Sequence, residues 1–198
     1  MTFLSPAQMD TFVAQGYVIL NDALSTSELL VLNKEFDQLL TSEAFKKAQI
    51  ATGPSHELIR GDWTYWLGEK SSPAFEKVFF DLKTWSLFLN ENLFCGITNL
   101  EAHLAHYPAG PGYKKHWDQA TGNFRRKISL VLYLNSDWPK HNGGELILYS
   151  ADSENILEKI EPYGGRLVMF RSDLFPHEVL PSLGARRSLT GWFRSDAL

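Results

Sequence analysis

Cysteine is almost absent from the sequence, since Cys95 is the only one among 198 residues. A single thiol excludes an internal disulfide and every zinc site that needs several cysteines. The chain also lacks an apolar run near the roughly 20 residues that span a bilayer. Its first residues, MTFLSPAQMD, have neither the basic segment nor the apolar core of a signal peptide. We therefore expect a cytoplasmic protein without membrane contact.

Positive charge is not in excess either. Lys and Arg number 19 against 23 Asp and Glu, which gives a formal net charge of −4. No overall positive field therefore attracts nucleic acid or an anionic membrane. A basic cluster does occur, and its members are Lys114, Lys115, Arg125, Arg126 and Lys127. Charge runs are most often solvated faces, and we interpret this cluster in that way.

The first half of the chain, residues 1–95, has mainly helical periodicity. Ser25-Thr-Ser-Glu28 has the pattern of a capping box, in which a serine and a glutamate satisfy backbone groups at a helix start. Gly53–Lys70 is irregular and rich in Gly and Trp. Three helices and one strand are predicted: helix Pro6–Gln15, strand Tyr17–Leu20, helix Ser25 to about Leu40, and helix from about Ala74 to Leu93.

From Thr98 onward the apolar period changes to two, which is typical of strands. Gly-rich turn signals separate the candidates. The strand candidates are the segment from Thr98 to His106, Lys127–Asn135, Glu145–Ser150, Ile156–Glu161, Arg166–Arg171, Glu178–Pro181 and Arg186–Phe193. Short strands at this spacing favour a jelly roll. We expect an α+β fold whose N-terminal helices pack on one face of the β core. One domain, residues 1–198, should contain a helical part (1–95) and the β core (96–195).

Two histidines and one aspartate form a candidate metal site. His116 and Asp118 are two residues apart, so in an extended strand both side chains project to one face. His177 would supply the third ligand from a later strand. Two imidazoles and a carboxylate on one octahedral face leave three positions open, as a redox iron site requires. The spacing of His116 and Asp118 alone is weak evidence, because such pairs occur by chance.

An arginine nine residues after His177 strengthens this interpretation. Arg186 opens the last predicted strand, and Ser188, Thr190 and Trp192 share its face. A buried guanidinium needs an anion, and its planar fork matches a carboxylate. The 5-carboxylate of 2-oxoglutarate is such an anion, and Tyr133 could add a phenolic hydrogen bond. Arg187 competes for this role, but alternation places it on the opposite face.

The remaining histidines have no partner pattern. They are His103, His106 and His141. Alternation along the strand that begins near Thr98 places Leu100, Ala102, Leu104 and His106 on the inner face. We interpret His106 as a packing residue and His103 as a surface or satisfied histidine.

Four segments in order resemble the prolyl 4-hydroxylase family of iron(II)- and 2-oxoglutarate-dependent oxygenases, most of all the oxygen-sensing prolyl hydroxylases and their bacterial relatives. Tyr107-Pro-Ala-Gly-Pro-Gly-Tyr113-Lys-Lys-His116-Trp-Asp118 resembles the iron-binding strand, and it is one residue shorter than in the animal enzymes. The others are Tyr133-Leu-Asn-Ser-Asp-Trp138, Gly143-Gly-Glu-Leu-Ile-Leu, and His177-Glu-Val-Leu-Pro181 followed by Arg186 and Trp192. Ile59-Arg60-Gly61-Asp62 with Trp66 resembles the mobile loop that covers a bound peptide.

The resemblance implies a double-stranded β-helix core and a dioxygenase that uses Fe(II), 2-oxoglutarate and O2, with ascorbate as a further expected cofactor. It implies His116, Asp118 and His177 as iron ligands. It further implies that Arg186, Tyr133, Tyr107 and Thr190 bind 2-oxoglutarate. The implied substrate residues are Arg60, Asp62, Tyr113, Arg126 and Trp192.

The favoured hypothesis is a hydroxylase that acts on a prolyl residue in a protein or peptide. Three alternatives stay open: an oxygenase for a small molecule, an oxygenase for nucleic acid, and a non-catalytic metal-binding β-barrel. The net charge of −4 makes nucleic acid the weaker partner. A non-catalytic protein has no need for a carboxylate-pairing arginine near its last histidine. The oligomeric state is not determined by the sequence, and a monomer is one option.

Overall fold

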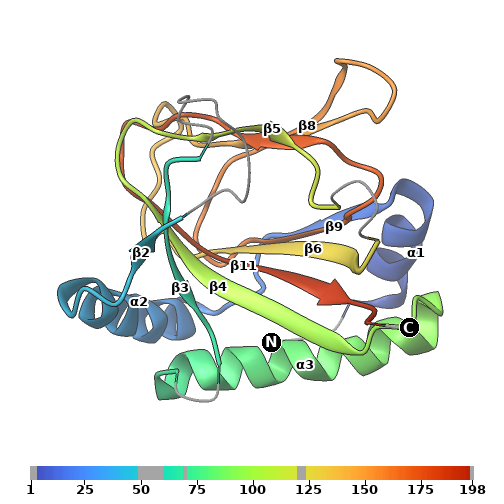
Figure 1. The fold of residues 1–198 in the computed structure, drawn as a ribbon, viewed down its shortest axis with the longest axis horizontal. Coiled ribbons are helices and arrows are strands. Elements are labelled where there is room, and N and C mark those ends of the chain that lie inside the picture. The colour runs from blue at the N-terminus through green and yellow to red at the C-terminus, as the bar shows by residue number, and fades with distance from the viewer. Residues whose placement is uncertain (1–3, 49–59, 69–70, 120–123, 197–198) are drawn as a thin grey trace.

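A computed structural model describes residues 4–48, 60–68, 71–119 and 124–196. Helices precede most of the strands along the chain (Figure 1). The helices in this part of the chain are α1 (Pro6–Gln15), α2 (Thr26–Thr41) and α3 (Pro73–Leu93). The strands are β1 (Tyr17–Leu20), β2 (Lys46–Lys47), β3 (Trp63–Trp66), β4 (Asn99–Tyr107), β5 (Tyr113–His116), β6 (Arg126–Tyr133), β7 (Leu146–Tyr149), β8 (Ile156–Ile160), β9 (Leu167–Arg171), β10 (His177–Val179) and β11 (Arg186–Arg194).

The helix starts follow from local capping. Ser5 caps α1 and Ser25 caps α2, and in each case the serine side chain accepts from the backbone N–H three residues later. The third residue, Gln8 or Glu28, reciprocates by accepting from the serine backbone N–H. This closed pair satisfies two otherwise free donors of the first helical turn. The capping box predicted at Ser25–Glu28 is therefore confirmed.

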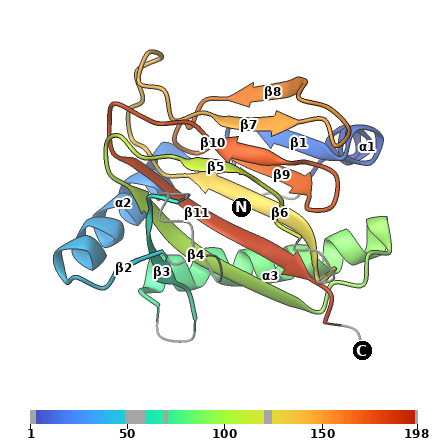
Figure 2. The same cartoon turned by 45° about the horizontal axis from the view of Figure 1, so that its top comes forward.

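Two antiparallel sheets make up the β core, as far as the described residues go. The large sheet has the strand order β1-β9-β6-β11-β4-β3-β2, and the small sheet has the order β5-β10-β7-β8. Figure 2 shows the small sheet lying over one face of the large sheet. Strand β11 lies between β4 and β6 and pairs with both over most of its length. The large sheet therefore presents one face to the small sheet and the other to the helices.

Apolar side chains fill the space on both faces of the large sheet. On the helix face, Phe36 of α2 and Leu82 of α3 belong to one buried cluster with Leu104 and Leu130. Figure 1 shows α3 running along the large sheet on the side away from the small sheet. Between the sheets, a second cluster includes Tyr133 and Phe170 of the large sheet and Leu146, Leu148 and Ile160 of the small sheet. Both faces of the central strands are consequently buried.

The predicted helices and strands are present, and the chain is a mixed α/β fold with antiparallel sheets. The prediction that Gly53–Lys70 is irregular is wrong for part of its length. Trp63–Trp66 forms β3, which pairs with His103–His106 of β4. Gly61 lies so close to Pro111 that a Cβ atom would be 2.2 Å from the Pro111 Cβ. Residues 53–59 and 69–70 of that segment lie outside the described residues.

None of the helices in the described parts of the chain has the length and apolar character needed to cross a membrane.

Two leucines test which face of each element is buried. Leu104 is fully buried against the helices, whereas Leu87 of α3 is 66% exposed. We expect Leu104→Ala to lower the free energy of unfolding by about 2–5 kcal/mol, because it removes buried methyl groups and leaves a cavity. Leu87→Ala should change it by roughly 0.5 kcal/mol or less. Urea titration monitored by circular dichroism measures both, and equal losses would contradict this assignment of faces.

Candidate active site

Three predicted ligands converge at one end of the small sheet. His116 is the last residue of β5, His177 is the first residue of β10, and the two are directly paired in register. Asp118 follows β5 by two residues. One ligand atom from each of the three side chains lies within 4.8 Å of the others, so a single metal ion can contact all three. The Nε2 atom of His177 is 3.5 Å from Asp118 Oδ2, and that of His116 is 3.9 Å from Oδ1.

The backbone fixes the tautomer of both histidines. The Nδ1–H of His116 donates to the carbonyl of Lys114 at 2.8 Å. The Nδ1–H of His177 donates to the carbonyl of Phe175 at 3.0 Å. Each Nε2 therefore faces the carboxylate and is the ring nitrogen left to bind a metal, which is the arrangement a metal site requires. Burial, followed by the neighbouring His177, lowers the pKa of His116 to about 3, so its imidazole is neutral.

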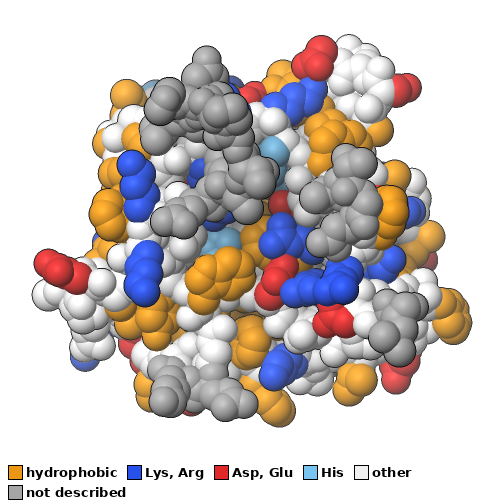
Figure 3. All heavy atoms as spheres, in the orientation of Figure 1, with side chains coloured by type: hydrophobic (Ala, Val, Ile, Leu, Met, Phe, Trp, Pro, Cys, Tyr) orange, Lys and Arg blue, Asp and Glu red, His pale blue; other side chains and the backbone are white. Residues whose placement is uncertain are grey.

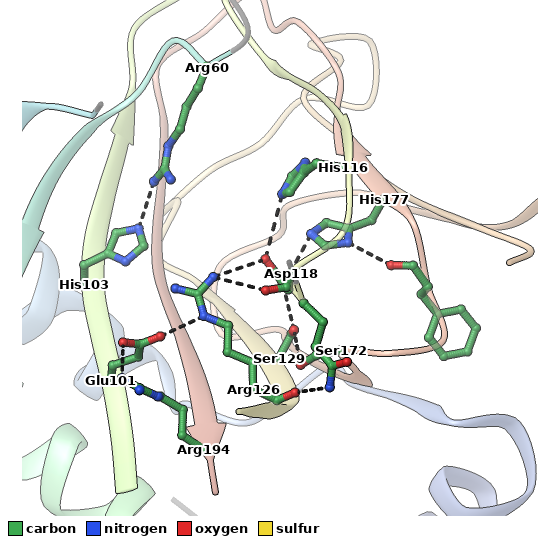
Figure 4. A network of polar contacts seen from close by, with 12 residues as sticks. Arg60, Glu101, His103, His116, Asp118, Arg126, Ser129, Ser172, His177 and Arg194 are labelled. Carbon is green, nitrogen blue, oxygen red and sulfur yellow. Dashed lines mark hydrogen bonds and ion pairs between the residues drawn. The ribbon is translucent and has the colours of Figure 1, made fainter. Parts of the chain in front are cut away.

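Asp118 is held as an anion. Burial alone would raise its pKa, but His177, His116 and the hydroxyl of Ser129 together lower it below its ordinary value. Ser129 on β6 donates to Asp118 Oδ2 at 2.6 Å, and Ser172 lies 2.8 Å from Ser129 (Figure 4). The donor set is two imidazole Nε2 atoms and one oriented carboxylate, which fits a divalent iron.

The triad opens into a cavity of about 130 Å³ between the two sheets. Figure 3 shows histidine side chains recessed in the face of the molecule, with basic, acidic and apolar side chains around them. The predicted site residues that line the cavity are Arg60, Tyr107, Tyr113, His116, Asp118, Arg126, His177, Arg186, Thr190 and Trp192. The predicted site residues Asp62 and Tyr133 do not line it and lie fully buried behind it.

The inner end of the cavity carries a buried cation. Arg186 is 2% exposed, and its Nε–H donates to the carbonyl of Gly144 at 3.1 Å. Its guanidinium lies 5.0 Å from the ring centre of Tyr133 and 5.3 Å from that of Tyr107. No carboxylate of the described residues pairs with it, and the Tyr133 hydroxyl finds no hydrogen-bond partner among them. A buried cation without a carboxylate partner, next to a buried phenol without a hydrogen-bond partner, fits an anionic ligand.

Arg187 points the other way, as strand alternation predicts. Its guanidinium contacts the ring of Phe36 in the helix cluster and pairs with Asp37 at 2.7 Å. Arg187 therefore joins β11 to α2, and of these two neighbouring arginines it is Arg186 that lines the cavity.

Arg60 and Asp62 act as one unit at the outer end of the cavity. Asp62 is fully buried, and both of its oxygens accept from Arg60, at 2.5 and 2.8 Å. Burial alone would lower the pKa of Arg60, but Asp62 raises it above its ordinary value. The Arg60 guanidinium lies over the ring of Tyr113, which stacks on the metal-ligand candidate His116 with ring centres 3.6 Å apart. Asp62 orients Arg60 and is itself shielded from a ligand in the cavity.

The interpretation of β4 needs a correction. His106, placed on the inner face by alternation, packs against Phe36 and Phe45 of the helix cluster. His103, interpreted as a surface or satisfied histidine, is 1% exposed and lines the cavity. The alternation rule assumes one wet face, and here both faces of β4 are buried. Tyr107 carries the signal that identifies the cavity face, because it ends the same strand and counting back by two gives Ala105 and His103.

His103 has a defined protonation state. Burial, then the charges of Arg60 and Arg126, lower its pKa to about 3, so the ring is neutral. Its Nε2 lies 3.3 Å from an Nη2 of Arg60, which can only donate, so the proton is on Nδ1. That Nδ1–H has no hydrogen-bond partner among the described residues. The ring contacts both Trp66 of β3 and Trp192 of β11, two large aromatic side chains that also line the cavity.

Comparisons with known proteins give one consistent family. The family model of the 2OG-Fe(II) oxygenase superfamily matches residues 102–194. The chain is similar to human prolyl hydroxylase EGLN3, with 31% identity over 169 residues that cover 79% of this chain and 69% of the human protein.

Solved structures agree with the sequence relatives. A Pseudomonas putida prolyl-4-hydroxylase matches with a TM-score of 0.85 and 34% identity, over 96% of this chain and 98% of that one. A Trichoplax adhaerens prolyl hydroxylase, solved with a hypoxia-inducible factor peptide fragment, matches with a TM-score of 0.85 and 28% identity, over 96% and 88%. Together with the His116, Asp118 and His177 constellation, these matches show that the chain belongs to the prolyl hydroxylases of the 2OG-Fe(II) oxygenase superfamily, whose members use Fe(II), 2-oxoglutarate and O2.

Proposed function

We propose that this chain hydroxylates a prolyl residue within a protein or peptide. One observation carries the proposal: a single cavity joins the metal-binding triad to an unpaired buried arginine at one end and to an aromatic mouth at the other. Trp66, which is 55% exposed, supplies an apolar face at that mouth, which suits an uncharged pyrrolidine ring, whereas the Trp192 ring lines the cavity beneath Arg126. The similar Trichoplax enzyme was solved with a peptide fragment, which supports a peptide as the partner here.

The cavity divides the proposed roles by position. His116, Asp118 and His177 would hold the iron through two Nε2 atoms and one carboxylate oxygen. Arg186 would bind the 5-carboxylate of 2-oxoglutarate, with the Tyr133 hydroxyl as a second donor. Tyr107 and Thr190 line the cavity near that end and complete the proposed co-substrate site. The proposed substrate residues at the mouth are Arg60, Tyr113, Arg126 and Trp192, with Asp62 acting through Arg60.

When bound, iron and 2-oxoglutarate activate O2, so that one oxygen atom enters the substrate C–H bond and the other enters succinate, with release of CO2. The protein binds and orients the reactants. Arg186 fixes the anionic end of the co-substrate, and the triad fixes the metal. Trp66, Trp192 and Tyr113 enclose the mouth and exclude water from the reacting carbon, which limits side reactions. Orientation of this kind supplies much of the rate enhancement of enzymes.

We further propose that residues 1–198 form one catalytic domain in which residues 1–95 support the β core. The shared apolar cluster of α2, α3 and the large sheet supports this arrangement, with the N-terminal helices packed on one outer face. In this proposal the helices contribute no group to the chemistry, because α1, α2 and α3 supply none of the residues that line the cavity.

The basic cluster gives little support to a nucleic-acid substrate. Lys115 pairs with Glu154 at 2.8 Å, and Arg126 pairs with Glu101 at 2.7 Å. Recognition of a phosphate backbone needs a continuous positive surface whose charges can displace counterions. Carboxylates instead neutralise these two members of the cluster.

The proposed function predicts that prolyl peptides are the substrates whose presence makes the enzyme consume 2-oxoglutarate. Incubation of a host-cell peptide extract with the iron-loaded protein, 2-oxoglutarate and O2 should yield prolyl peptides that gain one oxygen by mass spectrometry. Asp118→Ala is the matched control, and it should give none while keeping its circular dichroism spectrum. Parallel incubations with free amino acids and with oligonucleotides complete the comparison. Turnover stimulated by those small molecules or oligonucleotides, but by no peptide, would contradict the proposal.

The two neighbouring arginines separate co-substrate binding from folding. Arg186→Ala should raise the KM for 2-oxoglutarate at least tenfold, because truncating one partner of a buried charge-assisted pair costs about 2–5 kcal/mol. Arg187→Ala should leave that KM nearly unchanged and lower the melting temperature instead, because Arg187 connects β11 to Asp37 and Asn33 of α2. If Arg187→Ala raised the KM and Arg186→Ala lowered the melting temperature instead, β11 would be shifted by one residue.

Ser129 tests the support of the metal site. Ser129→Ala removes the hydroxyl that donates to Asp118, so the carboxylate loses its fixed orientation. We expect the affinity for Fe(II), or for Mn(II) as a spectroscopic substitute, to fall by about 10–100-fold. Titration of the metal-free protein measures it. Ser172→Ala serves as the control, because Ser172 contacts Ser129 and makes no hydrogen bond to Asp118, and it should lower the affinity much less.

A further inference from the structure

We propose that Glu101 is a positioning residue that neutralises Arg126 and so makes the mouth of the cavity select an uncharged peptide carbonyl over a carboxylate. In substrate terms, the target prolyl residue would be followed by a peptide bond rather than by a free C-terminus. This inference rests on the proposed function and narrows its substrate class. It is carried by the contacts of Arg126, which differ in kind from those of Arg186 in the same cavity.

The strand register places Glu101 and Arg126 on either side of Trp192. Trp192 of β11 is paired with Glu101 of β4 on one side and with Ser129 of β6 on the other. The guanidinium of Arg126 lies on the face of the Trp192 ring, 3.6 Å from its centre. From there its Nε–H donates to Glu101 Oε1 at 2.7 Å (Figure 4). The Arg126 side chain therefore crosses over β11. Its guanidinium is held by the ion pair with Glu101 and by stacking on the Trp192 ring.

Glu101 also holds a second arginine. Arg194 donates to Glu101 Oε2 at 2.8 Å, so the two oxygens of one carboxylate bind two different guanidinium groups. In the sheet, Arg194 is directly paired with Arg126. Like charges in directly opposed positions repel each other. Without Glu101 this repulsion would act on Arg126 and weaken its stacking on Trp192.

The remaining contacts of Arg126 leave one edge of its guanidinium open to the cavity. Its Nη1–H donates to the backbone carbonyl of Asp118 at 3.4 Å, and the same atom lies 3.9 Å from Asp118 Oδ1. Its Nη2 has no hydrogen-bond partner among the residues that the structure describes, and Arg126 lines the cavity. An oriented N–H donor thus faces the site, beside the carboxylate that the metal would use.

The charge around Arg126 determines whether its free N–H favours a neutral carbonyl or a carboxylate as acceptor. Arg186 is buried without a carboxylate partner, so it favours an anion. Arg126 is paired with Glu101, its side chain is 31% exposed, and solvent screens what remains of its charge. A neutral carbonyl accepts a hydrogen bond from Nη2 at no desolvation cost for a second charge. A substrate carboxylate would instead lie near Glu101, whose negative charge would repel it.

Two peptides of one sequence test the inference. Both end at the target proline, one as the C-terminal amide and the other as the free carboxylate. For wild-type protein, kcat/KM for the amide should exceed that for the carboxylate at least tenfold. Glu101→Gln keeps the side-chain shape and removes the negative charge, so this preference should fall at least fivefold, mainly through KM. The KM for 2-oxoglutarate should stay within about twofold.

Controls separate this charge effect from a loss of structure. Asp196→Asn removes one negative charge close by, where Asp196 pairs with Arg194 and has no contact with Arg126, and it should keep the wild-type preference. Peptide binding to zinc-loaded protein, which cannot turn over, gives a readout independent of activity. If Glu101→Gln is unstable, the double variant E101Q/R194Q restores the charge sum and should show the same fall in preference.

The outcomes are distinct. The positioning role of Glu101 is overturned if the Glu101→Gln protein keeps the wild-type preference for the amide. It is also overturned if kcat/KM falls by the same factor for both peptides. A wild-type protein that prefers the free carboxylate overturns it as well. A wild-type protein that decarboxylates 2-oxoglutarate but hydroxylates neither these peptides nor any longer prolyl peptide contradicts the proposed function, and the inference with it.

Discussion

The pairing of β11 with β4 on one side and β6 on the other determines most of the geometry of the cavity. This register places Arg186 opposite Tyr107, Thr190 opposite both His103 and Val131, and Trp192 between Glu101 and Ser129. Side chains on one face of three adjacent strands thus form a continuous wall, because neighbouring strands lie about 4.8 Å apart. A shift of β11 by one residue would send all of its contributions to the helix face.

The small sheet supplies the metal ligands, and the large sheet holds them in place. His116 and His177 are paired across β5 and β10, so the backbone determines their separation before any metal binds. Asp118 lies just beyond β5 and has no strand of its own to hold it. Ser129 of β6 provides that constraint from the opposite sheet. The site therefore depends on the packing of the two sheets, in which the apolar cluster around Tyr133, Phe170 and Leu148 takes part.

The sequence was sufficient to predict the three helices and most strands, because capping patterns and periodicity are local signals. His177 is distant in the chain from His116 and Asp118, and it was identified as the third ligand through Arg186 and the family resemblance. Prediction from the sequence failed where burial is decided by distant segments. Alternation places His103 and His106 on opposite faces of β4. Because both faces are covered, alternation could not show which of the two faces lines the cavity. Trp63–Trp66 forms a strand because it pairs with the edge of β4, and no local sequence pattern predicts that pairing. The pairing of Glu101 with Arg126 and Arg194 joins three strands that are distant in the sequence, so no local pattern predicts it.

The three arginines of the cavity differ in how their charge is balanced, and this difference orders the site from inside to outside. Asp62 neutralises Arg60 and Glu101 neutralises Arg126, and both arginines lie near the aromatic mouth. Arg186, at the inner end, has no acidic partner among the described residues and is almost fully buried. An anion gains most where a cation is both desolvated and unpaired. The co-substrate is therefore drawn past the mouth to the inner end, and the mouth remains available for a neutral segment of chain.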